Sequence, residues 1–487
     1  MFMLPGGCRV QTIVQAGITL IVSAALLTGC AAGPDYLRPE VTVPANWQAR
    51  YPHQGKTLDL VSWWATFRDP VLIELLEAAE ASSPTLASAA AKIDKARADL
   101  ASSASGLFPT ISGTGAVERA NSQSYGSTLL LTTTSTGKLD ASWEIDLFGK
   151  VRRQIEAGAA RVDGTITDWH DGRVTLAAEV ADDYVQYKGC RVLVRLYRDE
   201  LASQQATQRA TQSSAAAGNV APADLSLAQA GTASAASSLI GQEAQCDLLV
   251  KSLVVLTGLS EPELRRTLAR GSDRIPTLPG ISVTSVPAGL LSQRPDVVSL
   301  ERELAARNAE ISAAEANRYP SLSLSGAISV TQITGTGTLA PWSFGPTLSL
   351  PIFDAGKREA AVDAAAASYR DARAAYEKGV RKAAGDVEKA LVWLDSTRRR
   401  VVQARTAAVN YRSYFSAADK NWRAGGISLL TREEAHRSAQ AAETTLVGLE
   451  RDQVQYWIAL YKALGSGWRA ASSRTMVAQT QENPKLQ

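Results

Sequence analysis

The sequence is poor in the residues that most often carry out chemistry. It has only four cysteines and three histidines, and the histidines (His53, His170 and His436) do not have the spacing of metal ligands. It contains no Walker-type phosphate loop and no nucleophile elbow. Carboxylates are abundant, but a charge on a long helix usually belongs to a solvated face. We therefore predict that the protein is not an enzyme and that it uses no cofactor and no metal.

An excess of one charge and long apolar runs are also missing. Lys and Arg number 51 against 48 Asp and Glu, a net charge of +3 that gives no reason to expect nucleic-acid binding. No segment reaches the roughly 18 consecutive apolar residues of a transmembrane helix. If the chain crosses a membrane, strands must do so. The hydrophobic content of 45% with only 6% aromatic residues reflects heavy use of alanine, which favours long helices over a single globular core.

The first 29 residues are typical of a signal peptide. The apolar run 16–27 is too short to span a bilayer, and it ends in Leu27-Thr28-Gly29-Cys30. This ending resembles the bacterial lipobox, whose cysteine is acylated and becomes the mature N-terminus. The alternative is an ordinary signal peptide followed by a chance cysteine. We expect Cys30 to carry the lipid, and the Ala31 that follows resembles lipoproteins sorted to the outer membrane.

An internal repeat organises the chain. Three glycines recur at an offset of 207 residues: Gly149, Gly218 and Gly258 are matched by Gly356, Gly425 and Gly465. Two copies of one structural unit are therefore expected. The predicted parts are a signal peptide 1–29, an N-terminal lipid-anchored segment 30–69, a first repeat 70–258, an irregular proline-bearing connector 259–293, a second repeat 294–468 and a polar C-terminal tail 469–487.

Each repeat contains two segments in which apolar and polar residues alternate. The clearest are 138–147 and 342–352, with expected partner strands at 110–117 and 321–331. Half-buried strands of a soluble sandwich would show the same pattern. Membrane strands are favoured because the lengths suit a tilted strand and aromatics cluster near the ends: Phe108, Phe148, Tyr319, Trp342 and Phe353. Four strands cannot close a barrel and an open edge is not viable in lipid, so three chains would have to supply twelve.

Two very long helices are expected after the strands. Proline is absent from 151–221 and from 352–483, and helices over 151–217 and 358–424 would each be about 100 Å long. The second carries an apolar residue at every seventh position: Val380, Val387, Leu394, Val401, Ala408, Phe415 and Trp422. This repeat predicts a left-handed coiled coil. Turns at 218–222 and 425–428 would start returning helices that end near Gly258 and Gly465.

Two of the cysteines are predicted to form a disulfide. An exported chain meets an oxidising compartment. Cys190 and Cys246 lie about 30 and 26 residues on either side of the turn near Val220, which places them within roughly one helical turn in height. Cys246 also belongs to the seven-residue series Leu225, Thr232, Leu239, Cys246 and Leu253. The alternative is a pair of reduced, buried thiols.

Several short motifs give the chain a family resemblance. They are Gly33-Pro34-Asp35-Tyr36, Trp63-Trp64 with Phe67, Asp69 and Pro70, Leu290-Leu291 with Arg294-Pro295-Asp296, Ala314, Tyr319-Pro320, and Pro351-Ile352-Phe353-Asp354-Ala355-Gly356. In order and spacing, the chain resembles the TolC-like outer-membrane efflux duct family, in its lipoprotein (NodT-type) branch.

The resemblance implies a mainly α protein with a membrane β-barrel portion. Three copies of the chain would share a 12-stranded barrel, continued by a long antiparallel coiled-coil tunnel in the periplasm. The lipid-anchored homotrimer would stand in the outer membrane and meet a periplasmic adaptor protein and, through it, a proton-driven inner-membrane efflux pump. It would passively conduct small molecules such as drugs. The alternatives are a duct for exported polypeptides and a structural periplasmic lipoprotein.

The resemblance also implies sites at the periplasmic tip. The turns would contact the adaptor: Gly218, Asn219 and Val220 in the first repeat, and Gly425, Gly426, Ile427 and Ser428 in the second. A gate is expected at Leu430 and Glu434, an apolar and an acidic residue on one face of the returning helix. The acidic position is Glu rather than the family's Asp, and Glu433 lies beside it, so which carboxylate faces the channel stays open. Solvated surface charge is the alternative.

Overall fold

The computed structural model describes residues 32–39, 64, 67–122, 130–276, 294–335 and 337–465. The predicted signal peptide, the predicted lipid-bearing Cys30 and the C-terminal tail lie outside the described residues. In the part of the chain that is described, no helix is both long enough and apolar enough to cross a membrane.

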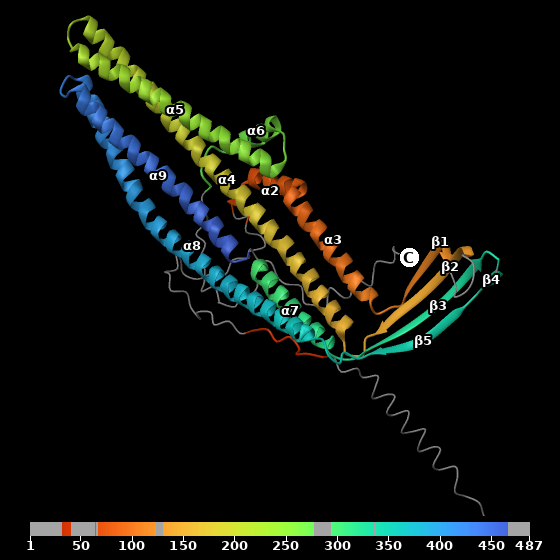
Figure 1. Ribbon diagram of the computed structural model, residues 1–487. Helices are drawn as coiled ribbons and strands as arrows, with labels where there is room; N and C mark the ends of the chain where they lie inside the picture. Colours follow the sequence, from red (N-terminus) through yellow and green to blue (C-terminus); the bar gives the residue numbers. More distant parts are fainter. Residues whose placement is uncertain are drawn as a thin grey trace, which may run out of the picture. The chain divides into compact units, whose positions relative to one another are not determined.

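The repeat is visible in the two helical hairpins (Figure 1). Their helices are α4 (Lys150–Ala216), α5 (Pro222–Thr257), α8 (Lys357–Arg423) and α9 (Leu429–Ala463). Helices α4 and α8 contain 67 residues each and start within one residue of the predicted positions. All six repeat glycines have a positive φ, between 67° and 84°. Glycine adopts this conformation without the steric cost that other residues bear, which explains why these glycines recur where helices begin and end.

Four shorter helices complete the described helical part: α2 (Pro70–Ser82), α3 (Pro84–Ser105), α6 (Glu261–Ala269) and α7 (Pro295–Ala316). The prediction of an irregular connector is wrong for α6. Pro262 lies in the first turn of this helix, and Glu261 and Glu263 are in the same turn. Proline is well tolerated there because the first N–H groups have no intrahelical partner, and acidic residues favour the helix N-terminus.

The sheet is antiparallel and joins the two repeats. Its strands are β1 (Thr110–Ser122), β2 (Leu130–Ile145), β3 (Ser321–Ile333), β4 (Gly337–Leu339) and β5 (Trp342–Ser349). The order is β1-β2-β3, and both β4 and β5 pair with β3. The second strand predicted for the second repeat, 342–352, is β5, and a short additional strand, β4, precedes it and pairs further along β3. Strands β1 and β3 extend to Ser122 and Ile333, past the predicted ends at 117 and 331. Strand β2 begins at Leu130 instead of 138, because the Thr-rich stretch 130–137 does not alternate.

In the single chain, many apolar side chains of the sheet are exposed. They include Ile111, Val117, Leu131, Leu139, Ile328, Val330, Trp342, Phe344 and Leu348. A soluble sandwich would cover such side chains with a second sheet. Among the described residues there is one sheet, and these side chains remain exposed. The sandwich alternative is therefore disfavoured.

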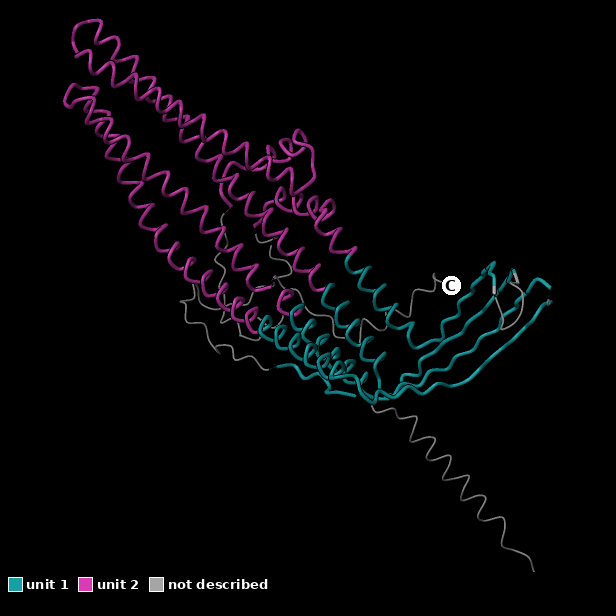
Figure 2. Tube along the Cα trace, viewed as in Figure 1, with its two compact units in different colours: residues 1–40, 92–165, 299–376 teal, residues 41–91, 166–298, 377–487 magenta. Residues whose placement is uncertain are grey.

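The chain divides into two compact units (Figure 2). Unit 1 comprises residues 1–40, 92–165 and 299–376 and contains the sheet. Unit 2 comprises residues 41–91, 166–298 and 377–487 and contains both hairpin turns. Within unit 2, the first five members of the predicted heptad series, from Val380 to Ala408, are buried, and the last two, Phe415 and Trp422, are half-buried. The heptad positions therefore form the packed seam that a coiled coil requires.

Candidate functional site

The two hairpin turns of unit 2 are built by the same hydrogen bonds. In the first turn the Asn219 N–H donates to the Ser214 carbonyl, and in the second the Gly426 N–H donates to the Asn421 carbonyl, both at 2.9 Å. These bonds span five residues and close the helix ends in the Schellman pattern. Gly218 and Gly425 supply the positive φ that the pattern needs. The repeat therefore sets the geometry of both tips.

The turns present mostly exposed residues. Gly218, Asn219, Gly425, Gly426 and Ser428 are exposed, while Val220 and Ile427 are half-buried. Helix α5 starts with Pro222, and Ser428 starts α9 by accepting the Thr431 N–H at 3.2 Å. All seven residues predicted to contact an adaptor thus lie at the ends of the hairpins, and their role in adaptor binding stays a prediction.

The predicted gate residues lie one turn further along α9. The Leu430 side chain is 50% exposed, and Glu434 is exposed four residues later. Their neighbours Leu429 and Glu433 are buried, at 7% and 8% exposure. Which carboxylate faces the channel stays a prediction. On the single chain Glu434 is the exposed one, whereas Glu433 is turned into the contact between the hairpins, where it accepts a hydrogen bond from Gln204.

Arg432 is the centre of a buried polar group behind these residues. It is 3% exposed, its Nε donates to Asp419 Oδ1 of α8 at 2.8 Å, and it pairs with Glu433. Its guanidinium lies over the rings of Phe415 and Trp422, at 5.3 and 5.2 Å from the ring centres. Charge pairing and ring contacts together satisfy a cation that would be costly to bury alone.

A second set of polar side chains continues from Arg432 towards α4. Gln204 Nε2 donates to Glu433 Oε2 at 2.6 Å, and His436 Nε2 lies 2.9 Å from Glu200 Oε2. Sequence reasoning missed this contact. The available signals were weak: Glu200 and Gln204 are four residues apart on α4, and Glu433 and His436 are three apart on α9, each pair on one helix face.

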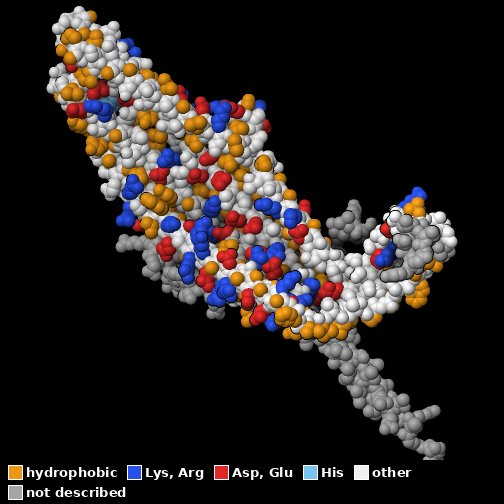
Figure 3. Space-filling view, viewed as in Figure 1, with side chains coloured by type: hydrophobic (Ala, Val, Ile, Leu, Met, Phe, Trp, Pro, Cys, Tyr) orange, Lys and Arg blue, Asp and Glu red, His pale blue; other side chains and the backbone are white. Residues whose placement is uncertain are grey.

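Charged side chains of both signs are interspersed along the helices (Figure 3). Many of these pair with one another at the surface, such as Arg405 with Glu450 across α8 and α9 at 2.7 Å. Among the described residues, no group of three or more His, Cys, Asp or Glu side chains is arranged to hold a metal ion.

The first hairpin contains the disulfide between Cys190 of α4 and Cys246 of α5. Their Cα atoms are 5.6 Å apart, within the range of protein disulfides. Both residues are buried and pack with Val194, Tyr187, Leu239 and Leu249. The structure thus contains the bond that the position of the two cysteines around the turn predicted.

Unit 2 also has a groove of about 490 Å³ between α4, α5 and α9. Asp182 accepts hydrogen bonds from Gln186 and Gln455, and Asp183 accepts one from Ser252. Burial raises the pKa of Asp183, and the neighbouring Asp182 raises it further. Both carboxylates already have protein partners, which is the pattern of a structural contact.

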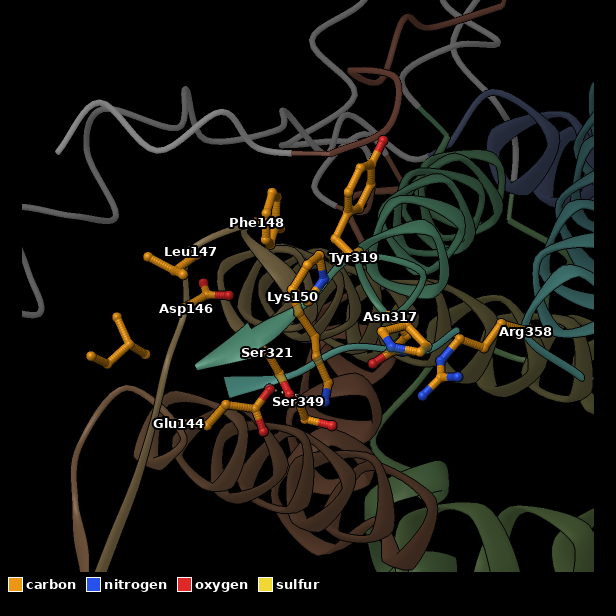
Figure 4. Close-up of a pocket in the computed structure, with 14 residues that line it drawn as sticks. Glu144, Asp146, Leu147, Phe148, Lys150, Asn317, Tyr319, Ser321, Ser349 and Arg358 are labelled. Atoms are coloured by element: carbon orange, nitrogen blue, oxygen red, sulfur yellow. Dashed lines mark ion pairs between the residues drawn. The ribbon is translucent and has the colours of Figure 1, made fainter. Parts of the chain in front are cut away.

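Unit 1 has a smaller pocket of about 200 Å³ where the strands meet the long helices (Figure 4). Asp146 accepts the N–H groups of Val151 and Arg152, at 3.1 and 3.0 Å, and so caps α4. Lys150 pairs with Glu144 at 3.5 Å across this pocket. The charged groups pair with each other or cap a helix, so the pocket joins strand to helix and shows no catalytic arrangement.

The segment 32–39 is fastened to the helices of unit 1. Asp35 pairs with Arg153 Nη2 at 2.6 Å, and the Tyr36 hydroxyl donates to Glu301 Oε1 at 2.7 Å. The Ala32 N–H donates to the Phe148 carbonyl at 3.0 Å. The Gly33-Pro34-Asp35-Tyr36 motif is therefore a structural fastening just after the predicted lipid site.

Comparison with known proteins points to one family. The profile of the family described as "Outer membrane efflux protein" matches residues 75–259 and 286–466. The chain is 29% identical over 453 residues to "Nodulation protein T" of Rhizobium leguminosarum bv. trifolii, covering 91% of this chain and 96% of that protein. It is 30% identical over 446 residues to "Pyoverdine export outer membrane protein OpmQ" of Pseudomonas putida, covering 89% and 93%.

Solved structures agree with these sequence relatives. The outer-membrane channel OprN superposes with a TM-score of 0.81 at 28% identity, covering 91% of this chain and all of that one. The CmeC outer membrane channel of Campylobacter jejuni superposes with a TM-score of 0.83 at 20% identity, covering 94% of this chain and 99% of that one. At this lower identity, the second match shows a shared fold only.

Proposed function

The chain belongs to the outer membrane efflux protein family, whose members are channel proteins, and from this premise we propose how it works as the outer-membrane channel component of a tripartite efflux system. Three copies assemble into a passive duct through which small molecules leave the cell. An inner-membrane pump driven by protons supplies the energy, and a periplasmic adaptor joins the pump to the duct. The protein itself catalyses no reaction.

The proposed trimer agrees with the two open edges of the sheet. Strand β1 forms one edge and β4 with β5 forms the other. An open edge carries unpaired backbone groups, which are not tolerated in lipid. Pairing each edge with the next copy would give a closed barrel of twelve strand paths. The exposed apolar side chains of the strands would then face the membrane.

The observation that carries the proposed gate is the division of α9 into two faces. Leu430 and Glu434 are exposed on one face, while Arg432, Glu433 and His436 are buried on the other. Threefold symmetry would turn each exposed residue into a ring. The leucine ring would narrow the mouth, and the carboxylate ring would favour cations there.

Single-channel recordings in planar bilayers test this gate. In Leu430→Ala with Glu434→Gln, we expect a higher conductance and a weaker preference for cations than in the parent. The repeat provides a matched control, since Leu227 of α5 is the counterpart of Glu434 at the 207-residue offset and is 38% exposed. Leu227→Ala should leave both quantities unchanged. An unchanged conductance in the assembled double variant would place the gate elsewhere.

The exposed turns are the proposed adaptor contact. A bulky Asn219→Trp substitution leaves the turn's backbone hydrogen bond in place, because the Asn219 N–H makes it. We expect this variant to conduct normally in bilayers and to lose drug export in cells. Normal export would show that the first turn is not part of the contact.

The lipid anchor is proposed from the Leu27-Thr28-Gly29-Cys30 sequence. Intact-mass measurement should show an acylated N-terminus at Cys30, and Cys30→Ala should abolish the modification. An unmodified N-terminus in the parent protein would refute it. A polypeptide-secretion duct is the competing function. Cells that lack the protein should accumulate small toxic compounds, and normal accumulation together with a loss of exported proteins would favour the competitor.

A further inference from the structure

Helix α4 of the first hairpin packs against α9 of the second hairpin in a single register. Between the first and the last of four contacts, each helix advances by 22 residues, from 182 to 204 on α4 and from 455 to 433 on α9. Equal steps in opposite directions are expected of two antiparallel helices. The four contacts are Asp182 with Gln455, Gly189 with Arg451, Glu200 with His436, and Gln204 with Glu433.

The internal repeat gives every residue of this contact a counterpart 207 residues away. Residues of α4 correspond to residues of α8, and residues of α9 correspond to residues of α5. Side chains on the faces that α4 and α9 turn to each other are buried, but their counterparts on α8 and α5 are exposed. Examples are Val185 at 0% exposure and Val392 at 55%, Gln204 at 4% and Tyr411 at 46%, and Val447 at 8% and Ile240 at 67%. One face of α8 and one face of α5 therefore lack the cover that their counterparts have.

The two uncovered faces are compatible with each other. Where the contact within the chain buries Glu200, Glu433 and His436, their counterparts on α8 and α5 are Ala, Ser and Gln, which carry no charge. These residues can be buried without the cost of removing ions from water. The counterparts of the four contacts, none of which would oppose like charges, are Lys389 with Leu248, Ser396 with Ala244, Ala407 with Gln229, and Tyr411 with Ser226.

The sheet of unit 1 leaves the same parts of the repeat unpaired. Within one chain, β2 of the first repeat pairs with β3 of the second. The open edge of the first repeat is β1, and the open edge of the second is formed by β4 and β5. Among the helices, the uncovered face of the first repeat lies on α5 and that of the second on α8. In both units, the second repeat of one copy is left to meet the first repeat of another.

We propose that a second copy of the chain covers these faces, with α8 of one copy packed on α5 of the next in the register that α4 and α9 have within the chain. The proposal rests on the proposed trimer and specifies its helical interface. Tyr411 then packs on Ser226 and Gln229 of the next copy, because its counterpart Gln204 contacts both Glu433 and His436. Contacts within chains alternate with contacts between chains around the ring.

The contact at Gly189 supplies a distance with which to test this register. A Cβ atom added to Gly189 would lie 3.4 Å from the Cβ of Arg451. The Cβ atoms of disulfide-bonded residues are about 3.5–4.5 Å apart. The counterparts Ser396 and Ala244 are both small, so two copies can approach equally closely there. Cysteines at these two positions should therefore form a disulfide between neighbouring copies.

Oxidation of the purified full-length protein carrying Ser396→Cys and Ala244→Cys tests the register. On a non-reducing denaturing gel, we expect linked dimers and trimers to replace the single chain. Co-expressed copies that carry one substitution each should give linked dimers, which shows that the bond joins different chains. The matched control is Ser396→Cys with Ser237→Cys, which should not link, because Ser237 lies one heptad, about 10 Å, from Ala244. Cys190 and Cys246 are bonded to each other and do not compete.

Native mass spectrometry of the same samples separates failure of the register from failure of the proposed function. A trimer that links through Ser237, or through neither position, would overturn the register and leave the proposed channel intact. A protein that is monomeric would contradict the proposed trimer as well. If the Ser396 variant does not assemble, Tyr411→Cys with Ser226→Cys, bridged by a short bismaleimide, takes its place, and Tyr411→Cys with Ala233→Cys is then the control one heptad away.

Discussion

Reduction of the Cys190–Cys246 disulfide should loosen the outer part of the first hairpin. The bond joins residues 56 positions apart, and the loop that it closes contains the turn at Gly218. A cross-link of this kind limits the conformations that the opened loop can adopt. The chain-entropy relation gives about 4 kcal/mol for a loop of this length. Since about 1.4 kcal/mol is a factor of ten, opening should become about a thousandfold more frequent after reduction.

Hydrogen exchange followed by mass spectrometry measures this opening directly. Amides of peptides between the two cysteines should exchange up to about a thousandfold faster when reductant is added to the parent protein. The matched control is Cys190→Ala with Cys246→Ala, in which reductant should have no effect. The variant also loses buried side-chain contacts with Val194, so the comparison of oxidised with reduced parent isolates the cross-link.

If exchange between the cysteines is the same with and without reductant, and free thiols confirm the reduction, the hairpin is held by its other contacts. A uniform increase in exchange over the second hairpin as well would show that reduction disturbs assembly rather than the first hairpin alone.

Four further substitutions have expected effects on stability. Arg294→Ala should lower the free energy of unfolding by roughly 1–3 kcal/mol, because the buried guanidinium donates a hydrogen bond to the Ala463 carbonyl at 3.0 Å. An unchanged midpoint of chemical denaturation would contradict this expectation. Asp183→Asn should raise the melting temperature at pH about 7, because burial raises the pKa of Asp183 and makes its charged form unfavourable in the folded protein. This gain should disappear below pH about 4, where Asp183 is protonated in both the folded and the unfolded state, and a gain that persists there would refute the explanation. Gly425→Ala should lower the free energy of unfolding by about 1–2 kcal/mol because φ at this position is 77°. Gly385→Ala, in the interior of α8 where an added Cβ meets nothing within 4 Å, should instead raise it by roughly 0.5–1 kcal/mol, and equal melting temperatures of the two variants would refute this contrast.

The long helices could be predicted from the sequence because local rules determine them. Glycines that need a positive φ, the absence of proline and a seven-residue apolar repeat all act within a few residues of each other. Together they located α4 and α8 to within one residue. The disulfide followed in the same way, since antiparallel helices place residues at equal distances from a turn at the same height.

The buried polar contact between α4 and α9 could not be predicted because it joins distant parts of the chain. Gln204 and Glu433 are 229 residues apart, and each looks like an ordinary polar residue on its own helix. Burial of Arg432 likewise results from Asp419 and two aromatic rings on α8, which a single-helix pattern cannot show. The short strand β4, which precedes β5, was missed for a related reason, because pairing with β3 determines it.

The equal lengths of α4 and α8 place a shared constraint on how the two repeats can change. Seven residues of helix are about 10 Å long. A deletion of seven residues in α8 alone would move the second turn back by that distance while the first turn stayed in place. To keep both turns available to one partner, the same number of residues has to be lost from all four hairpin helices. A gene duplication supplies such matched lengths in a single event, and we expect length variants of this chain to differ by whole heptads taken equally from both copies.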